Sequence, residues 1–66
     1  MALLKVIELL AESEKSWEDA TQNAVSEAST TMRKIRSVYV KNLTAEVEDG
    51  KITHWRLNCK MTFEKE

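Results

Sequence analysis

Hydrophobic and polar positions change period along the chain and divide it into segments. Over residues 3–10 apolar side chains occupy both sides of a two-residue alternation, which predicts a strand with two apolar faces. Over residues 13–36 they recur every three or four positions instead, which predicts an amphipathic α-helix. This helical stripe consists of Trp17, Ala20, Thr21, Ala24, Val25, Ala28, Met32 and Ile35. Ser16 is suited to cap the helix, because its hydroxyl can accept a hydrogen bond from a free backbone N–H.

Two further strands are predicted at residues 37–47 and 51–63, on either side of Asp49-Gly50. An Asp-Gly pair between two strand-like segments strongly favours a tight hairpin turn. The face of the last strand directed to the helix holds Thr53, Trp55, Leu57, Cys59, Met61 and Phe63. The pattern therefore predicts an α+β fold in the order β-α-β-β, a single domain over residues 1–66. Its three-stranded antiparallel sheet curls around one helix.

A two-residue turn also predicts the register of this hairpin. The expected pairs are Val38 with Met61, Val40 with Cys59, Leu43 with Arg56, Ala45 with His54, Val47 with Ile52 and Glu48 with Lys51. In this register an apolar patch forms on the face that the helix does not cover, made of Leu43, Ala45, Val47 and Ile52. Because the chain has no other element to cover it, we expect the patch to contact another copy of the chain.

Composition changes this picture in one respect, the source of stability. A chain of 66 residues has a thin core and usually needs a disulfide, a metal or self-association. Cys59 alone cannot form an internal disulfide, and with His54 as the one histidine it cannot complete a Cys/His zinc site. A net charge of -1 favours neither nucleic acid nor an acidic membrane, and no apolar stretch is long enough to span a bilayer. We therefore expect a cytoplasmic protein that associates with itself, without nucleic-acid or membrane partners.

Five segments, in this order, resemble the dodecin family. They are Lys5-Val6-Ile7-Glu8-Leu9, Ser13-Glu14-Lys15-Ser16-Trp17-Glu18-Asp19-Ala20, Ile35-Arg36, Asp49-Gly50-Lys51-Ile52 and Lys60-Met61-Thr62-Phe63. The resemblance covers nearly the whole chain. It implies a hollow homododecamer of the bacterial or archaeal cytoplasm, with helices outside and sheets lining the interior. Such assemblies bind and buffer flavins, so riboflavin, FMN or FAD is the implied ligand.

The resemblance also implies a ligand site. In flavin-binding members a Trp at the start of the second strand stacks on the isoalloxazine ring, and a Gln in the third strand hydrogen-bonds the ring edge. Ser37 and Arg56 occupy those positions here, so a flavin site would be weakened. Arg56 can still donate hydrogen bonds and attract a phosphate or carboxylate. Tyr39 and His54 are the other candidate ligand residues, although a solvated strand histidine is the simpler interpretation of His54.

Two charged groups allow further chemistry. Glu46, Glu48 and Asp49 can offer oxygen ligands to calcium if symmetry brings copies together, although a charge group beside a turn is usually solvated. No metal site is predicted within one chain. The basic residues Arg33, Lys34 and Arg36 can hold a nucleotide phosphate, or can stabilise the end of the helix through its dipole. We favour the second interpretation.

The remaining candidates favour structure over chemistry. Trp17 and Trp55 lie at helical and strand spacing on the predicted core side, and Cys59 is interpreted as a small buried apolar residue. No nucleophile, base and orienting group stand at a spacing that suggests catalysis, so we do not expect an enzyme. The leading hypothesis is a dodecin-like cage that sequesters a small ligand. The alternatives are an assembly that binds a divalent cation at subunit junctions, and a purely structural oligomer.

Overall fold

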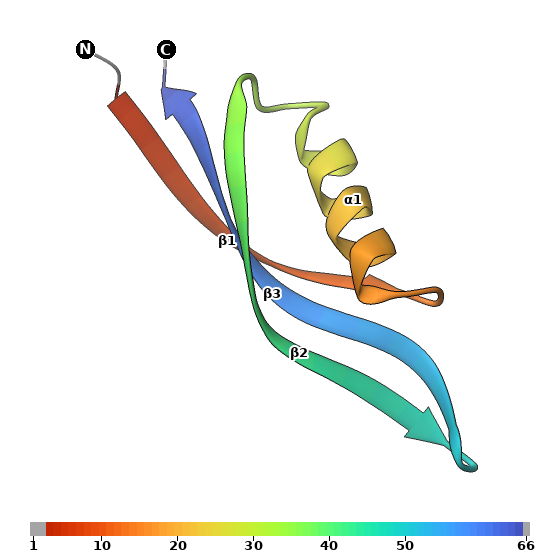
Figure 1. The fold of residues 1–66 in the computed structure, drawn as a ribbon. Coiled ribbons are helices and arrows are strands. Elements are labelled where there is room, and N and C mark those ends of the chain that lie inside the picture. The colour runs from red at the N-terminus through yellow and green to blue at the C-terminus, as the bar shows by residue number, and fades with distance from the viewer. Residues whose placement is uncertain (1–2, 66) are drawn as a thin grey trace.

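The computed structural model describes residues 3–65, which form three strands and one helix (Figure 1). In chain order they are β1 (Leu3–Ser13), α1 (Trp17–Ala28), β2 (Ile35–Glu48) and β3 (Lys51–Lys65). β3 is the central strand and is antiparallel to both neighbours. The predicted β-α-β-β order and three-stranded antiparallel sheet are therefore confirmed.

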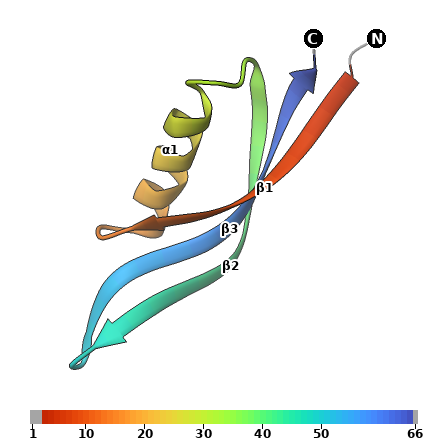
Figure 2. The same cartoon turned by 180° about the vertical axis from the view of Figure 1, so that it is seen from behind.

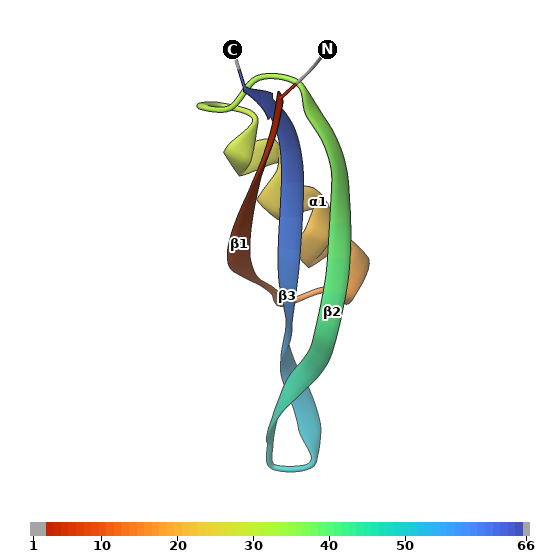
Figure 3. The same ribbon diagram turned by 90° about the vertical axis from the view of Figure 1, so that its left-hand side faces the viewer.

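The sheet is long and twisted, and α1 covers part of one face (Figure 3). β1 and the end of β3 lie side by side, so both termini are at the same end of the molecule (Figure 2). The hairpin of β2 and β3 extends past the start of α1 at the other end (Figure 1). Asp49 and Gly50 have φ angles of 50° and 75°. Positive φ at both central residues is what a two-residue hairpin turn requires, so the expected turn is confirmed.

The helix begins where the sequence predicts and ends earlier. Ser16 Oγ accepts a hydrogen bond from the backbone N–H of Asp19 at 2.9 Å, which confirms the N-cap. α1 stops at Ala28 after 12 residues, so the prediction of a helix up to residue 36 is wrong. No helix within residues 3–65 is long and apolar enough to cross a membrane.

Hydroxyl side chains explain the early end of α1. Ser29 Oγ donates to the carbonyl oxygen of Val25, and Thr30 Oγ1 to that of Glu27, both at 2.7 Å. Such side chains compete with the backbone for helical carbonyls and favour turns over helix. Lys34 then has a φ of 56°, and β2 begins directly after it.

The basic residues after the helix therefore do not stabilise its end. The last turn of α1 contains no basic residue, since Arg33 and Lys34 lie in the connecting loop and Arg36 lies in β2. The interpretation of these three side chains as partners of the helix dipole is wrong.

The core lies between α1 and the alternate residues of β3 that point to it. Leu57, Cys59 and Met61 are completely buried, and Ala20 of α1 is packed against them with no exposed surface. The small Ala side chain lets the helix approach the sheet closely. Burial raises the pKa of the Cys59 thiol, with the Glu8 carboxylate a smaller contributor, so the thiol stays neutral as a core residue should. The structural interpretation of Cys59 is confirmed.

The two tryptophans differ in how they contact the core. Trp17 packs against the core, and its indole Nε1–H donates to the carbonyl oxygen of Thr44 at 3.0 Å, which ties the start of α1 to β2. Trp55 is half-buried between Ser13 and Ala45 on the neighbouring strands, and it lies outside the core cluster of the described residues. The prediction of a core role is thus confirmed for Trp17 and wrong for Trp55.

The predicted register of β2 and β3 holds at both ends of the hairpin and fails in the middle. The observed pairs that match the prediction are Val38 with Met61, Val40 with Cys59, Val47 with Ile52 and Glu48 with Lys51. Between them the partner of Arg56 is Thr44 instead of Leu43, and the partner of His54 is Glu46 instead of Ala45. Those two predicted pairs are wrong.

Two compensating bulges cause this local shift. β2 has one extra residue between Lys41 and Thr44, where Asn42 has a φ of 53°. β3 has one extra residue at Thr53, whose Oγ1 donates to the carbonyl oxygen of Glu46 at 3.4 Å. Because a shift of one residue exchanges the faces of a strand, Glu46 moves to the face opposite α1, and Ala45, Val47 and Ile52 move away from it. The prediction of an apolar patch on the face that the helix does not cover, at this end of the hairpin, is therefore wrong.

Candidate functional site

The face of the sheet opposite α1, here called the uncovered face, is not covered by any other element of the described chain (Figure 3). It holds the even-numbered residues of β1 from Leu4 to Glu12 and of β3 from His54 to Thr62, with Ser37, Tyr39, Lys41, Thr44 and Glu46 of β2. Leu10 is 71% exposed and Val6 is 56% exposed. A strand buried on one side only would carry polar residues here, so these exposed apolar side chains indicate a surface that meets another molecule.

The four predicted ligand residues all lie on this face, but in two separate groups. Ser37 is paired with Thr62, and Arg56 is six positions away from Thr62 along β3. At a strand rise of about 3.3 Å per residue the two positions are roughly 20 Å apart. One chain therefore brings Ser37 together with Tyr39, and Arg56 together with His54, and does not unite the two groups.

The first group centres on an exposed aromatic ring. Tyr39 is 64% exposed and lies opposite Lys60 of β3, whose partner on β1 is Glu8. Ser37 is exposed on the next rung towards the chain termini, opposite Thr62. The group thus offers a ring face with hydroxyl and ammonium groups beside it, an arrangement suited to a planar ligand with a polar edge.

The second group is a network of ion pairs around Arg56. Its Nη2 lies 2.6 Å from Glu12 Oε1 and 2.8 Å from Glu46 Oε2, and its Nε donates to the same Glu12 oxygen at 3.0 Å. His54 Nδ1 lies 3.6 Å from the other oxygen of Glu46. Since two carboxylates already neutralise the guanidinium, Arg56 has little capacity left to attract an anionic ligand.

Sequence reasoning did not find the partners of Arg56. Glu12 was missed because the first strand was predicted to end at residue 10, whereas β1 continues to Ser13 and sets Glu12 opposite Arg56. Glu46 was considered only as one of the acidic residues near the turn, and the two bulges direct it to Arg56. A longer predicted first strand would have revealed Glu12, but no sequence pattern marks the bulges.

These ion pairs favour the charged forms of Glu8, Glu46 and Arg56. Hydrogen bonding to Arg56, helped by its charge, lowers the pKa of the Glu46 carboxyl, and the carboxylates of Glu46 and Glu12 raise the pKa of Arg56. Lys41 Nζ lies 3.1 Å from Glu8 Oε2 and lowers the pKa of that carboxyl in the same way. The ion pair between Lys41 of β2 and Glu8 of β1 crosses over β3, so it links the two edge strands of the sheet.

The acidic residues near the turn do not form a metal site in one chain. Glu46 is engaged by Arg56, while Glu48 and Asp49 are exposed at the tip of the hairpin. Within residues 3–65 no group of three or more His, Cys, Asp or Glu side chains is placed to hold a metal ion. A calcium site built on these carboxylates would need ligands from more than one copy.

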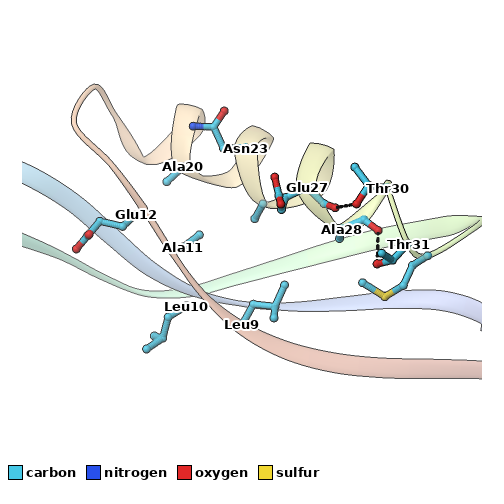
Figure 4. Close-up of a pocket in the computed structure, with 12 residues that line it drawn as sticks. Leu9, Leu10, Ala11, Glu12, Ala20, Asn23, Glu27, Ala28, Thr30 and Thr31 are labelled. Atoms are coloured by element: carbon cyan, nitrogen blue, oxygen red, sulfur yellow. Dashed lines mark hydrogen bonds between the residues drawn. The ribbon is translucent and has the colours of Figure 1, made fainter.

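A groove of about 550 Å³ separates α1 from β1 (Figure 4). Leu9 and Ala11 of β1 point towards Ala20 and Ala28 of α1, whereas Leu10 points away from the helix (Figure 4). β1 is an edge strand, so the backbone groups on its outer side have no partner strand within the described chain. An apolar groove beside a free strand edge is a second surface suited to another polypeptide.

Comparisons with known proteins agree with this architecture. The family model for Dodecin matches residues 3–66. The dodecin of Streptomyces coelicolor has a TM-score of 0.93 and 32% identity over 98% of this chain and 93% of that chain. Streptomyces davaonensis dodecin, at 23% identity, has a TM-score of 0.92 over 98% of this chain and 96% of that chain, and shows the fold alone.

A further similar structure is described as a calcium-chelating immunodominant antigen, calcium dodecin, from Mycobacterium tuberculosis with a novel calcium-binding site. It has a TM-score of 0.83 and 31% identity over 97% of this chain and 91% of that chain. Among curated protein sequences, none matches this chain.

Proposed function

The chain belongs to the dodecin family, and from that premise we propose that it assembles into a homo-oligomer that binds a small planar ligand of the flavin class. The assembly is a dodecamer by family likeness. The ligand lies on the uncovered face, between copies, with Ser37, Tyr39, His54 and Arg56 as the residues nearest to it. The role is binding and sequestration, without a catalytic step.

Self-assembly is supported by three surfaces that one chain leaves open. They are the apolar residues of the uncovered face, the groove between α1 and β1, and the outer edge of β1. At the hairpin end Leu43, Val47 and Ile52 are exposed, and we propose that they contact another copy, as predicted for the patch that also includes Ala45. A chain of 66 residues gains from such contacts the buried area that its own core lacks.

The observation that carries the ligand proposal is the exposed ring of Tyr39. It is on the same face as Ser37 and one rung away from it, so it can supply part of the stacking surface that Ser37 does not. Aromatic stacking contributes about 0.5–1.5 kcal/mol beyond the area it buries, which corresponds to at most about tenfold in affinity. We therefore propose weak flavin binding that depends on Tyr39.

A fluorescence titration tests this proposal. Riboflavin and FMN emission is followed as the purified oligomer is added, and stacking on Tyr39 is expected to quench it. Ser37→Trp should tighten binding about tenfold because it adds a ring, Tyr39→Ala should abolish quenching, and Tyr39→Phe should retain it. If neither the wild type nor an oligomeric Ser37→Trp variant quenches flavin emission, the ligand proposal is wrong while the assembly stands.

A divalent-cation site is the second candidate function. The similarity to a calcium dodecin favours it, and Glu48 and Asp49 are exposed carboxylates that symmetry can bring together. Calcium that binds the folded assembly must raise its melting temperature by mass action. A melt that is identical with calcium and with chelator would exclude this candidate, and Glu48→Gln with Asp49→Asn should remove any calcium effect.

A further inference from the structure

Four ionisable side chains of the uncovered face form one continuous network that spans all three strands. Glu12 of β1 lies opposite Arg56 of β3, and Glu46 of β2 lies opposite His54 of β3. The guanidinium of Arg56 bridges the two carboxylates, at 2.6 Å from Glu12 Oε1 and 2.8 Å from Glu46 Oε2. The remaining oxygen of Glu46 lies 3.6 Å from His54 Nδ1, so His54 is at the end of the network.

The charges of this network do not balance while His54 is neutral. Arg56 supplies one positive charge against the negative charges of Glu12 and Glu46, so one negative charge is in surplus. Protonation of His54 adds the missing positive charge directly beside Glu46. His54 is the one histidine of the chain, and histidine is the side chain that ordinarily changes charge between about pH 5 and pH 8. A single proton is therefore enough to balance the network.

Among the described residues, the nearest other charges do not compensate the surplus. Glu8 is paired with Lys41 at 3.1 Å, so that pair is neutral as a whole. Towards the turn Glu48 lies opposite Lys51, again one charge of each sign. Lys60 is six positions from the histidine along β3, roughly 20 Å at the rise of a strand, where salt screens it. β1 ends before it reaches the rung of the histidine, and α1 lies on the other face of the sheet (Figure 3).

A copy of the chain that packs on the uncovered face also covers this network. Leu10 is 71% exposed and lies two positions before Glu12 on β1, on the same face and about 7 Å away at the rise of a strand. In the single chain the side chains of His54 and Glu46 are 35% and 51% exposed, so water screens the surplus charge. Contact with another copy at Leu10 removes part of this water, and an unbalanced charge is then less favourable than a balanced one.

We propose that self-association takes up a proton at His54, which makes the assembly more stable as the pH falls from about 8 to about 6. This inference rests on the self-assembly proposed above and adds a response to pH. The protonated ring donates to Glu46 while Arg56 keeps the other oxygen of that carboxylate, so the network stays intact and becomes neutral. Because the assembled state binds the proton more tightly, the gain is present at the lower pH and is lost as the pH rises.

Urea dissociation of the full-length protein, followed by sedimentation velocity at about pH 8, 7 and 6, tests the proposal. Urea carries no charge, so it does not screen the ion pairs as a salt does. The urea concentration that separates half of the assembly should rise as the pH falls, and circular dichroism of the same samples distinguishes dissociation from unfolding. If assembly binds the proton about tenfold more tightly, the dissociation constant for each copy should fall by nearly that factor.

Three variants identify the group that takes up the proton. His54→Gln keeps a polar side chain but cannot become charged, so its urea midpoint should stay constant over this range. Glu46→Gln removes the surplus negative charge and should also give a constant midpoint. Glu48→Gln is the matched control, because Glu48 is an exposed carboxylate two positions from Glu46 on the same strand. Its midpoint should rise on acidification as that of the wild type does.

The possible outcomes separate this inference from the assembly itself. A wild-type midpoint that is the same at all three pH values overturns the inference and leaves self-assembly standing. A rise that persists in His54→Gln also overturns it, because another group then takes up the proton, and so does a Glu48→Gln variant that loses the rise as Glu46→Gln does. A wild type that sediments as a single chain without urea at every pH overturns both the inference and the assembly.

Discussion

The two faces of the sheet show how one alternating sequence serves two purposes. On the α1 side, Leu57 and Met61 of β3 are completely buried under the helix. On the uncovered face, Leu10 is 71% and Tyr39 64% exposed. The α1 side is the richer in apolar residues, because β3 is polar on the uncovered face from His54 to Thr62, but β1 carries apolar residues on both faces and the one helix of the described chain covers only one of them. The difference teaches that the covered face stabilises the fold, while the uncovered face is available to other molecules.

The kind of interaction also differs between the faces. The buried cluster on the α1 side consists of apolar residues, whereas Glu8 with Lys41, and Arg56 with Glu12 and Glu46, form ion pairs on the uncovered face. Exposed ion pairs contribute little to stability because water and salt screen them. They can instead hold side chains of the uncovered face in fixed positions for a partner.

The largest expected effect comes from the covered face. Leu57→Ala should lower the free energy of unfolding by about 2–5 kcal/mol, because it removes buried area and leaves a cavity. Denaturant unfolding measures this decrease. The matched variant Leu3→Ala changes an exposed residue at the start of β1 and should shift the free energy by less than about 0.5 kcal/mol. Equal decreases in both variants would show that burial under α1 is not the cause.

The next effect concerns the uncovered face. Leu10→Asp should weaken self-association by about tenfold to a hundredfold at each interface that buries Leu10, since burying a leucine contributes about 1.5–3 kcal/mol. Sedimentation velocity would detect smaller species, while circular dichroism should still show the strands and the helix. The control Gln22→Asp, on the exposed side of α1, should leave the assembly intact. If the wild type is already a folded single chain, the uncovered face does not need a copy of the chain to cover it.

A smaller effect is expected at the start of the covering helix. Ser16→Ala removes the hydrogen bond to the N–H of Asp19 and should cost about 1 kcal/mol in stability. The midpoint of thermal unfolding measures it. Ser16→Asp keeps an acceptor at the cap and should remain near the wild type; a decrease as large as that of the alanine variant would show that the cap is not the cause.

The smallest effect is the pH dependence of the ion pairs. The pKa of Glu46 is lowered in the folded state by Arg56, so its ionised form stabilises the fold above the ordinary value of 4.5. This contribution is lost as the pH falls below 4.5 and through the lowered folded value. Unfolding followed from pH 7 to pH 3 should therefore show a steeper decline for the wild type than for Glu46→Gln. Glu48→Gln, which removes an unpaired carboxylate among residues 3–65, should decline as the wild type does.

Local patterns were sufficient for most of the architecture. The period of two in β3, the Asp49-Gly50 turn and the Ser16 cap each depend on residues close together in sequence, and each was predictable. The apolar residues on both faces of β1 were predictable too, whereas the apolar patch predicted at the hairpin was assigned to the wrong face. The alternation of β3 likewise identified Leu57, Cys59 and Met61 as its buried residues.

What only the tertiary structure decided depends on contacts between distant segments. The bulges near Asn42 and Thr53 place Thr44 instead of Leu43 opposite Arg56, and no periodic pattern in the sequence marks them. They bring Glu46 to Arg56 and send Ala45 to Trp55. In the same way Glu12 meets Arg56 only because β1 pairs with β3. Sequence alone therefore determined which faces exist, through short-range periodicity, and folding decided which charges meet on them, through long-range pairing.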